Sequence, residues 1–434
     1  MSPFGFPRTA LASALAIPTK IVHLFYSFNI KIEMTEQNSI DAAINRHVAD
    51  GDLAGAAALV WRQGHVVHAA SVGTRDLQSR LPIERDTIFR IASMTKPITA
   101  VAALTLLDEG RFDLDDPITG CAPELARMRV LRDPEGPVDQ TDNAARAITF
   151  RDLLTHRSGL TYPECHRGPI GRALGEALGP TIDNPLTPDD WIARLATMPL
   201  IDQPGAQFHY GVSSDLLGFL IARLEGAPLN EVCARRVFTP LGMRDTGFTV
   251  PREMRHRRAG LCGFDDEGRL TSLSATPGRH ALEERPDDMR FESGGQGLWS
   301  TLDDYLAFAR MLIGDGPQLL QSTTLAMMTS NQLTPEQRAS ARMFGRPIFA
   351  AGHGYGMGVA VVMEPDKADT LRCRGGAGTI GWPGAYGSWW QADPNDHSVL
   401  IFLTHSMTEL HQMARGIGLG AWSAIASFHQ IATA

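Results

Sequence analysis

Segments with strand character occur near both ends of this 434-residue chain, whereas its middle has the character of helices joined by loops. The runs that predict strands span residues 56–61, 65–72, 87–91, 355–362, 384–392 and 398–405. The apolar periodicity that predicts helices spans residues 98–110, 189–198, 215–224, 229–237, 305–312 and 408–428. Turn residues join the first two strands at Arg62-Gln63-Gly64 and the last two at Asp393-Pro394-Asn395-Asp396, as in antiparallel hairpins. We therefore expect an α/β sheet domain built from residues 35–117 and 291–434, with a mostly helical domain inserted over residues 118–290.

The first 34 residues do not fit this pattern. Residues 10–17 are apolar and follow Arg8, but the run is short for the hydrophobic part of a secretory signal. No stretch of the chain is long and apolar enough to span a membrane. We expect residues 1–34 to be an extension that is disordered or not native, and we expect a cytoplasmic protein. Export through a weak N-terminal signal is the alternative.

Charge and metal-ligand spacing exclude several classes of function. The formal net charge of −8 gives no support to binding of nucleic acid or of an anionic membrane. The five cysteines are widely spaced and include no C-x-x-C pair, which excludes a full disulfide framework and the standard zinc spacings. None of the 14 histidines falls in an H-x-x-x-H or H-E-x-x-H pattern. We expect no metal and no cofactor, and the sequence leaves the oligomeric state undetermined.

The seven residues Ile91-Ala-Ser-Met-Thr-Lys-Pro97 join the predicted strand over residues 87–91 to the predicted helix over residues 98–110. Ser93 therefore lies where a strand gives way to a helix N-terminus. Lys96 follows one helical turn later, so its amine can meet the serine hydroxyl. A serine nucleophile needs a base within hydrogen-bond reach, and lysine serves when its surroundings keep it uncharged. The helix N-terminus adds an electropositive site that suits a developing oxyanion.

Lysine is rare in this chain, which gives the S-x-x-K spacing more weight than it has alone. By itself the spacing also fits a helix-capping serine near a surface lysine. The forty basic residues include only four lysines: Lys20, Lys31, Lys96 and Lys367. Because the guanidinium of arginine does not deprotonate in proteins, a base at position 96 has to be lysine. Ser93 and Lys96 are therefore the candidate nucleophile and base.

Two further segments contain candidate residues for the same chemistry. Tyr210 precedes the predicted helix over residues 215–224, and a tyrosine beside a cationic lysine can act as a phenolate or pass protons. An aromatic residue at the rim of a cavity is the alternative interpretation. The segment Gly381-Trp382-Pro383-Gly384-Ala385 opens a predicted strand, where glycine permits close approach of a substrate to the backbone. A simple turn or bulge explains that segment equally well.

The order of these motifs resembles that of the serine hydrolases with the class C β-lactamase fold, and most closely their esterase branch, the family VIII carboxylesterases. The matching segments are Ser93-Met94-Thr95-Lys96, Tyr210-Gly211-Val212 and Trp382-Pro383-Gly384, supported by residues 153–160, 240–243 and 294–301. The resemblance covers about residues 38–430. It implies an antiparallel sheet flanked by helices. It also implies that Ser93 is the nucleophile and that Lys96 and Tyr210 activate it. The backbone N–H groups of Ser93 and Ala385 would form the oxyanion hole.

The sequence departs from the lactamases at two positions of these motifs. The lactamases have Y-x-N as the second motif and Lys or His before a glycine in the third. Here Val212 stands at the Asn position and Trp382 at the cation position, which removes polar groups that would bind an amide and a carboxylate. The esterases of this group tend to have W-G-G, so Pro383 is a further departure. Val212, Trp382, Gly384 and Ala385 are the candidate oxyanion or substrate-binding residues.

These observations together predict a serine carboxylesterase that acts on a small-molecule ester. We expect hydrolysis of short-chain acyl esters through a seryl acyl-enzyme, with weak or no β-lactam hydrolysis. The alternatives are a class C-like β-lactamase or a D-Ala or D-amino-acid peptidase, an acyltransferase, and a non-catalytic binding homologue. The missing cation of the third motif argues against the lactamase. The presence of Ser93, Lys96 and Tyr210 argues against the non-catalytic homologue, whereas acyl transfer stays open.

Overall fold

The computed structural model describes residues 40–166, 168–273, 282, 285–286, 288–343, 346–368, 375–408, 412–413 and 415–433. The extension predicted over residues 1–34 lies outside these ranges. Within the described ranges, no helix is both long and apolar enough to cross a membrane.

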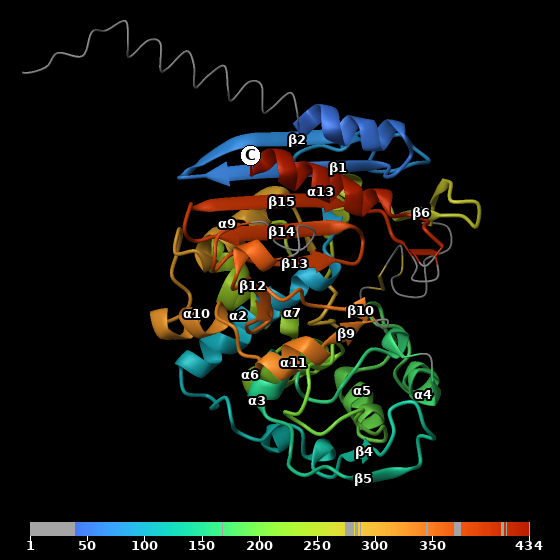
Figure 1. Cartoon of the computed structure of the whole chain (residues 1–434), viewed down its shortest axis with the longest axis vertical. Coiled ribbons are helices and arrows are strands. Elements are labelled where there is room, and N and C mark those ends of the chain that lie inside the picture. The colour runs from blue at the N-terminus through green and yellow to red at the C-terminus, as the bar shows by residue number, and fades with distance from the viewer. Residues whose placement is uncertain are drawn as a thin grey trace, which may run out of the picture.

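Seven strands form one antiparallel sheet in the order β11-β12-β13-β14-β15-β1-β2. They are β1 (Gly55–Arg62), β2 (His65–Gly73), β11 (His353–Tyr355), β12 (Ala360–Val362), β13 (Ile380–Gly384), β14 (Ser388–Asp393) and β15 (Ser398–Thr404). The N-terminal hairpin of β1 and β2 lies at one edge of the sheet, where β1 pairs with β15 (Figure 1). Both ends of the chain therefore build one sheet, and the predicted fold class is confirmed.

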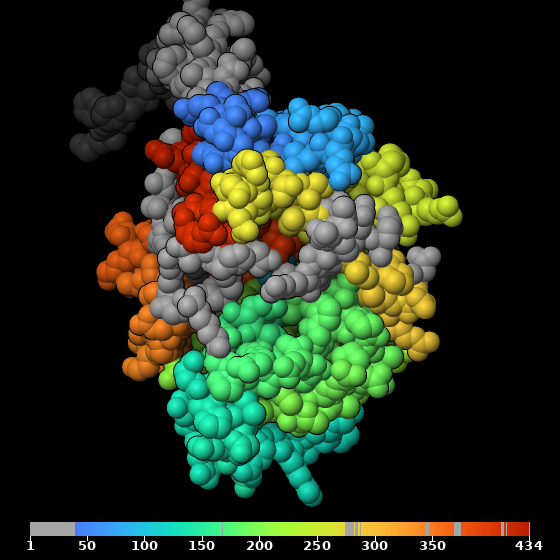
Figure 2. Space-filling model, turned by 90° about the vertical axis from the view of Figure 1, so that its right-hand side faces the viewer, coloured from blue at the N-terminus to red at the C-terminus, as the bar shows by residue number. Residues whose placement is uncertain are grey.

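The remaining elements are helices and short two-stranded ladders. A helix over residues 40–49 is followed by α2 (Thr95–Asp108), α3 (Phe150–Leu154), α4 (Pro169–Leu178), α5 (Pro188–Leu195), α6 (Ser213–Glu225), α7 (Leu229–Cys233), α8 (Thr239–Leu241), α9 (Leu302–Leu312), α10 (Ser322–Met328), α11 (Pro335–Ser340) and α13 (Gly420–Ala432). The ladders are β3 (Phe89–Arg90) with β8 (Trp299–Ser300), β4 (Arg129–Leu131) with β5 (Thr141–Asn143), β6 (Cys262–Phe264) with β7 (Leu270–Ser272), and β9 (Arg342–Met343) with β10 (Arg346–Pro347). Helices α3 to α6 lie below the sheet in Figure 1 and contribute to the green lower body of the molecule in Figure 2.

Helices cover both faces of the sheet. Successive residues of a strand point to opposite faces, and alternate residues of β1 accordingly enter two different hydrophobic clusters. Ala58 and Val60 belong to the cluster that contains residues of α13 and of the helix over residues 40–49. Leu59 and Trp61 belong to the larger cluster, which contains residues of α2, α6 and α9. The apolar run of β1 is therefore buried on both sides.

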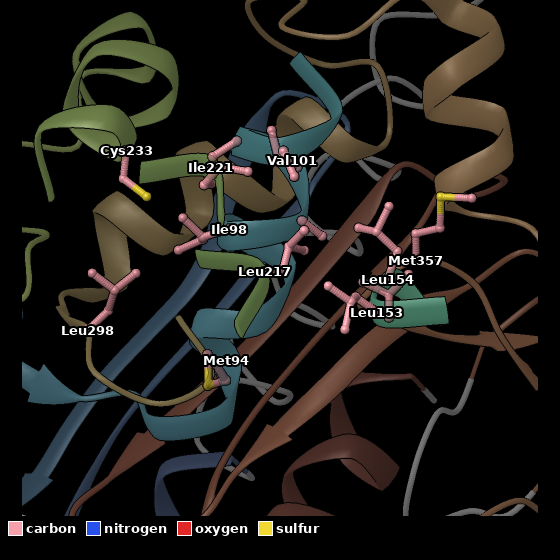
Figure 3. Close-up of a cluster of buried hydrophobic side chains, with 14 of the residues drawn as sticks. Met94, Ile98, Val101, Leu153, Leu154, Leu217, Ile221, Cys233, Leu298 and Met357 are labelled. Carbon is pink, nitrogen blue, oxygen red and sulfur yellow. The ribbon is translucent and has the colours of Figure 1, made fainter. Parts of the chain in front are cut away.

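Helix α2 runs through the centre of the molecule. Every residue from Thr95 to Leu106 is buried, which is typical of a helix that is surrounded on all sides. It packs against α6 and α7, and Figure 3 shows side chains of α2 and α6, among them Ile98 and Leu217, in the same buried cluster. Although α2 comes from a segment assigned above to the sheet domain, it contacts helices of the predicted inserted domain. The division into these two domains stays a prediction.

Glycines change the bounds of two predicted strands. The strand predicted over residues 355–362 is a hairpin of β11 and β12, because Gly358 between them has a φ of +86°. The strand predicted over residues 384–392 begins late, since Gly384 ends β13 and a turn with Gly387 at φ +80° precedes β14. A positive φ of this kind interrupts a strand and is easily adopted only by glycine.

Two predicted helices also have different bounds. In the last helix, predicted over residues 408–428, residues 409–411 and 414 lie outside the described residues and residues 412–413 are helical. Gly416 and Gly418 then have φ values of +83° and +71°, and α13 begins at Gly420. Left-handed backbone cannot continue a right-handed helix. The helix predicted over residues 229–237 is α-helical only as far as Cys233 and continues as a π-helical turn.

Candidate active site

The turn before α2 holds Ser93 in place. Ser93 lies in a 3₁₀ turn, Ala92–Met94, that leads directly into α2. Ala92 has a φ of +44°, a left-handed backbone that is uncommon for a residue with a Cβ atom. Strand β13 passes so close that a Cβ atom on Gly384 would lie 2.6 Å from the carbonyl oxygen of Ile91. The packing of β13 against this turn therefore requires glycine at position 384.

Ser93 Oγ lies within hydrogen-bond distance of both predicted partners. Lys96 Nζ is 3.1 Å from Ser93 Oγ, and the hydroxyl of Tyr210 donates to the same oxygen at 2.8 Å. Ser93 is 7% exposed and Lys96 is 1% exposed. The structure therefore brings together the three residues that the sequence indicates as nucleophile and activating pair.

The amine of Lys96 is enclosed by protein oxygens and aromatic rings. Besides Ser93 Oγ, it meets the hydroxyl of Tyr162 at 3.1 Å and the carbonyl oxygen of Gly295 at 2.9 Å. Its nitrogen lies 4.7 Å from the ring centre of Tyr210 and 5.3 Å from that of Tyr162. Because the face of an aromatic ring stabilises an ammonium, this enclosure also suits the lysine once it has taken up a proton.

Trp382 and Val212, the two departures from the lactamase motifs, have different surroundings. The indole Nε1–H of Trp382 donates to the hydroxyl oxygen of Tyr210 at 3.3 Å. Its ring also packs edge to face on Tyr355, with 5.2 Å between the ring centres. Val212 precedes α6, and its side chain is buried in the large hydrophobic cluster. The structure thus places Trp382 beside the Tyr210 hydroxyl and gives Val212 a packing position.

The two backbone N–H groups expected to form the oxyanion hole, those of Ser93 and Ala385, have no acceptor among the described residues. Within the described ranges, neither the N–H of Ser93 nor that of Ala385 donates to a protein acceptor. Ala385 directly follows β13, which contacts the Ser93 turn. The ladder between β13 and β14 pairs Pro383 with Trp389 without a register shift, so the proline leaves this backbone regular. Ser93 is buried and Ala385 is exposed. Both N–H groups are thus free of described protein acceptors, and the second lies where a substrate oxygen can reach it.

Sequence reasoning missed two residues of this site, Tyr162 and Asp215. The hydroxyl of Tyr162 donates to Asp215 Oδ2 at 3.3 Å, and Asp215 Oδ1 accepts from the Ser293 hydroxyl and the Gly295 N–H. Tyr162 lies two residues beyond the matched segment that ends at Leu160, and no spacing marks it. Asp215 falls in the first turn of a predicted helix, where an acidic residue has an ordinary explanation in the helix dipole.

Burial governs the protonation of the groups around Lys96. It raises the pKa of the Asp215 carboxyl, and Lys96 lowers that pKa only while its amine is protonated. Burial, and then the Asp215 charge, raise the pKa of Tyr162 well above its usual range. His156, whose ring centre lies 5.1 Å from that of Tyr210, has a pKa well below its usual range because of burial and then the Lys96 charge. Tyr162 and His156 are therefore uncharged neighbours of the site at neutral pH.

Comparison with known proteins identifies the family of the chain. The profile of the family described as Beta-lactamase matches residues 40–420. Protein Rv1367c of Mycobacterium tuberculosis is 43% identical over 84% of this chain and 89% of its own length. Esterase EstB of Burkholderia gladioli is 31% identical over 85% of this chain and 90% of its own length.

A solved structure has the same architecture. EstCE1, described as a hydrolase with promiscuous acyltransferase activity, matches with a TM-score of 0.73 and 25% identity, over 91% of this chain and 99% of its own. Together with the match to an esterase, this confirms the resemblance to the family VIII carboxylesterases that the order of motifs indicates. The chain belongs to the Beta-lactamase family and has its fold, in a branch of hydrolases that includes esterases.

Proposed function

We propose that this protein is a serine carboxylesterase that hydrolyses short-chain acyl esters through an acyl-enzyme on Ser93. One observation carries the proposal: Ser93 Oγ lies 3.1 Å from the Lys96 amine and 2.8 Å from the Tyr210 hydroxyl. A base and a proton donor within this reach are what acyl transfer to a serine requires.

Acylation uses the two partners in different roles. As Ser93 Oγ attacks the ester carbonyl carbon, its proton passes to the uncharged amine of Lys96, and the carbonyl oxygen gains negative charge near the N–H groups of Ser93 and Ala385. The carbon–oxygen bond to the alcohol then breaks, and Tyr210 gives its phenolic proton to the leaving oxygen. The acyl-enzyme therefore contains a Lys96 ammonium and a Tyr210 phenolate. The short distance from Lys96 to the Tyr210 ring and the Trp382 N–H both stabilise this charge pair.

Deacylation returns the protons. Water attacks the acyl carbonyl and gives a proton to the Tyr210 phenolate. The bond between Ser93 Oγ and the acyl carbon breaks, and Oγ takes back the proton from Lys96. The enzyme is thereby restored, and the products are a carboxylic acid and an alcohol.

The surroundings of Tyr210 favour esters over β-lactams. A penicillin or cephalosporin brings a carboxylate, and placing that charge in a pocket is costly without a cationic partner. Trp382 offers an apolar ring with one N–H at the position where the lactamases have Lys or His, and that N–H already donates to Tyr210. The packing position of Val212 likewise leaves the amide of a lactam without a side-chain partner, at a cost of about 1–3 kcal/mol for a buried polar group.

The test compares kcat/KM for p-nitrophenyl acetate and butyrate with kcat/KM for nitrocefin and benzylpenicillin. The proposal predicts much higher efficiency on the two esters. Equal or greater efficiency on the two lactams would overturn the esterase assignment.

A second function, acyl transfer to an alcohol, is favoured by the description of EstCE1, to which this chain is similar along most of its length. An alcohol that replaces water in the second step gives its proton to Tyr210 in the same way. Addition of a primary alcohol during turnover of p-nitrophenyl butyrate tests it. Formation of the new ester at the expense of butyrate supports transfer, and unchanged butyrate yield argues against it.

A further inference from the structure

We propose that Asp215, acting through Tyr162, fixes the direction of the hydrogen bonds around Lys96 so that the lone pair of its amine faces Ser93. Tyr162 and Asp215 are then positioning residues of the reaction. The inference rests on the proposed function, because it assigns Lys96 the role of the base.

Lys96 Nζ has three oxygen neighbours among the described residues: Ser93 Oγ, the Tyr162 hydroxyl and the Gly295 carbonyl. An uncharged amine has two N–H bonds and one lone pair to share among these three directions. The carbonyl oxygen of Gly295, at 2.9 Å, can only accept and therefore takes one N–H. The second N–H and the lone pair are left for Ser93 and Tyr162.

Asp215 determines whether Ser93 or Tyr162 accepts the second N–H of Lys96, and which of them faces its lone pair. A tyrosine hydroxyl can donate or accept, whereas a carboxylate only accepts. The hydroxyl of Tyr162 therefore turns its proton to Asp215 Oδ2 at 3.3 Å, and its oxygen accepts the second N–H of Lys96 at 3.1 Å. Only the lone pair remains, and it points to the proton of Ser93.

The carboxylate of Asp215 is held in the orientation that this assignment needs. Its Oδ1 accepts from the Ser293 hydroxyl and from the Gly295 N–H at 3.1 Å, which leaves Oδ2 for Tyr162. Asp215 is 2% exposed and lies in the first turn of α6, where the helix dipole favours negative charge. Gly295 thus contacts both ends of the network, through its N–H to Asp215 and its carbonyl oxygen to Lys96.

The network is packed too closely for a side chain at position 295. A Cβ atom on Gly295 would lie 2.6 Å from Asp215 Oδ2 and 2.8 Å from the Tyr162 hydroxyl oxygen, nearer than real Cβ contacts come. The close approach of these groups is therefore a specific feature of the fold.

The substitution Asp215→Asn tests the direction of the hydrogen bonds with little change in shape. Because Ser293 and Gly295 both donate to Oδ1, the asparagine amide would place its oxygen there and its NH₂ group toward Tyr162. The Tyr162 oxygen would then accept from the amide, and its proton would turn to the Lys96 lone pair and compete with Ser93. We expect kcat on p-nitrophenyl butyrate to fall at least about tenfold, with KM changed less than about twofold, the scale of a misplaced catalytic group. The rate of labelling by a fluorophosphonate should fall in parallel.

A double-mutant cycle separates this role from a structural one. Tyr162→Phe removes the group through which Asp215 acts and should itself lower kcat at least about tenfold, because one N–H of Lys96 loses its acceptor. In the Tyr162→Phe protein, the added Asp215→Asn change should lower kcat by less than about twofold. A merely structural or directly electrostatic role of Asp215 would give the same loss in both backgrounds.

Asp304→Asn is the matched control. Asp304 is also a buried carboxylate in the first turn of a helix, with the Thr246 hydroxyl and the Asp245 N–H as donors. It therefore reports the cost to stability of losing such a charge, and its kcat should stay within about twofold of the wild type.

The measurements separate failure of this inference from failure of the proposed function. Suppose that the wild type is active. The inference is overturned if Asp215→Asn keeps the wild-type kcat, or if it lowers kcat equally in the wild-type and Tyr162→Phe backgrounds; either result leaves the proposed function intact. A wild type that neither turns over esters nor reacts with the fluorophosphonate overturns both. If Asp215→Asn does not fold, Tyr162→Phe decides alone: a kcat loss with unchanged KM supports the inference, and retention of kcat overturns it.

Discussion

The two sides of Ser93 Oγ differ in how far they are closed. On one side, Lys96 is 1% exposed, and among the residues that the structure describes its amine meets only oxygens and aromatic rings. On the other side, Tyr210 is partly exposed, and its hydroxyl contacts Ser93 and the Trp382 indole. A base that exchanges a proton only with the enzyme's own serine can be sealed off, whereas a group that exchanges protons with alcohol and water must be reachable. The closed side therefore suits Lys96 as the base and the open side suits Tyr210 as the proton donor.

The largest expected effect comes from substitution of Lys96, on the closed side of Ser93. Lys96→Arg keeps the positive charge, but a guanidinium cannot accept the serine proton. We expect kcat on p-nitrophenyl butyrate to fall about 10²–10⁴-fold, as much as for Lys96→Ala. Lys367→Arg, at an exposed residue that pairs with Glu364, is the matched control and should leave kcat unchanged. An arginine variant that keeps most of the wild-type kcat would show that Lys96 acts only through its charge.

The next effect tests the open side. Tyr210→Phe removes the proton donor for the leaving alcohol and should lower kcat at least about a hundredfold, with little change in the binding of a substrate analogue. Tyr355→Phe is a suitable control, because the buried hydroxyl of Tyr355 has no partner within the described residues. If Tyr210→Phe changed only KM, Tyr210 would contact the substrate without transferring a proton. The proposed difference between the two sides of Ser93 would then be wrong.

The smallest effect concerns the indole next to Tyr210. Trp382→Phe keeps an aromatic ring but removes the N–H that donates to the tyrosine oxygen. This hydrogen bond contributes about 0.5–1.5 kcal/mol when Tyr210 is neutral and about 1.5–3 kcal/mol when it is a phenolate. Only the difference, about 1–1.5 kcal/mol, lowers the barrier, so kcat should fall about 5–10-fold. A loss as large as that of Tyr210→Phe would mean that Trp382 itself takes part in proton transfer.

Local features of the sequence predict Ser93, Lys96 and Tyr210 but not Tyr162 and Asp215. The meeting of Ser93 and Lys96 follows from their spacing in one helical turn, and Tyr210 is marked by its motif. Tyr162 meets Lys96, and Asp215 meets Tyr162, only because three segments distant in the sequence pack together. No periodicity or spacing encodes that packing, so these two residues could not be found.

For the fold, the sequence likewise predicts which segments form the sheet but not where each strand begins and ends. The strand-like runs near both ends of the chain, with the turns at residues 62–64 and 393–396, suffice to predict that both ends build the sheet. The bounds near β13 and β14 were wrong because they depend on the backbone of single glycines, and Gly384 and Gly387 shift the strand start by several residues. Those same glycines set the position of Ala385 beside the nucleophile turn, so local backbone detail matters most at the site.

Intact-mass spectrometry after reaction with a fluorophosphonate tests the central claim most directly, because it detects the nucleophile without assuming a substrate. The account predicts one adduct per chain, located by peptide mapping on Ser93, and no adduct on a folded Ser93→Ala variant with an unchanged melting temperature. Labelling that persists in the Ser93→Ala protein, or that maps to another residue, would contradict the account.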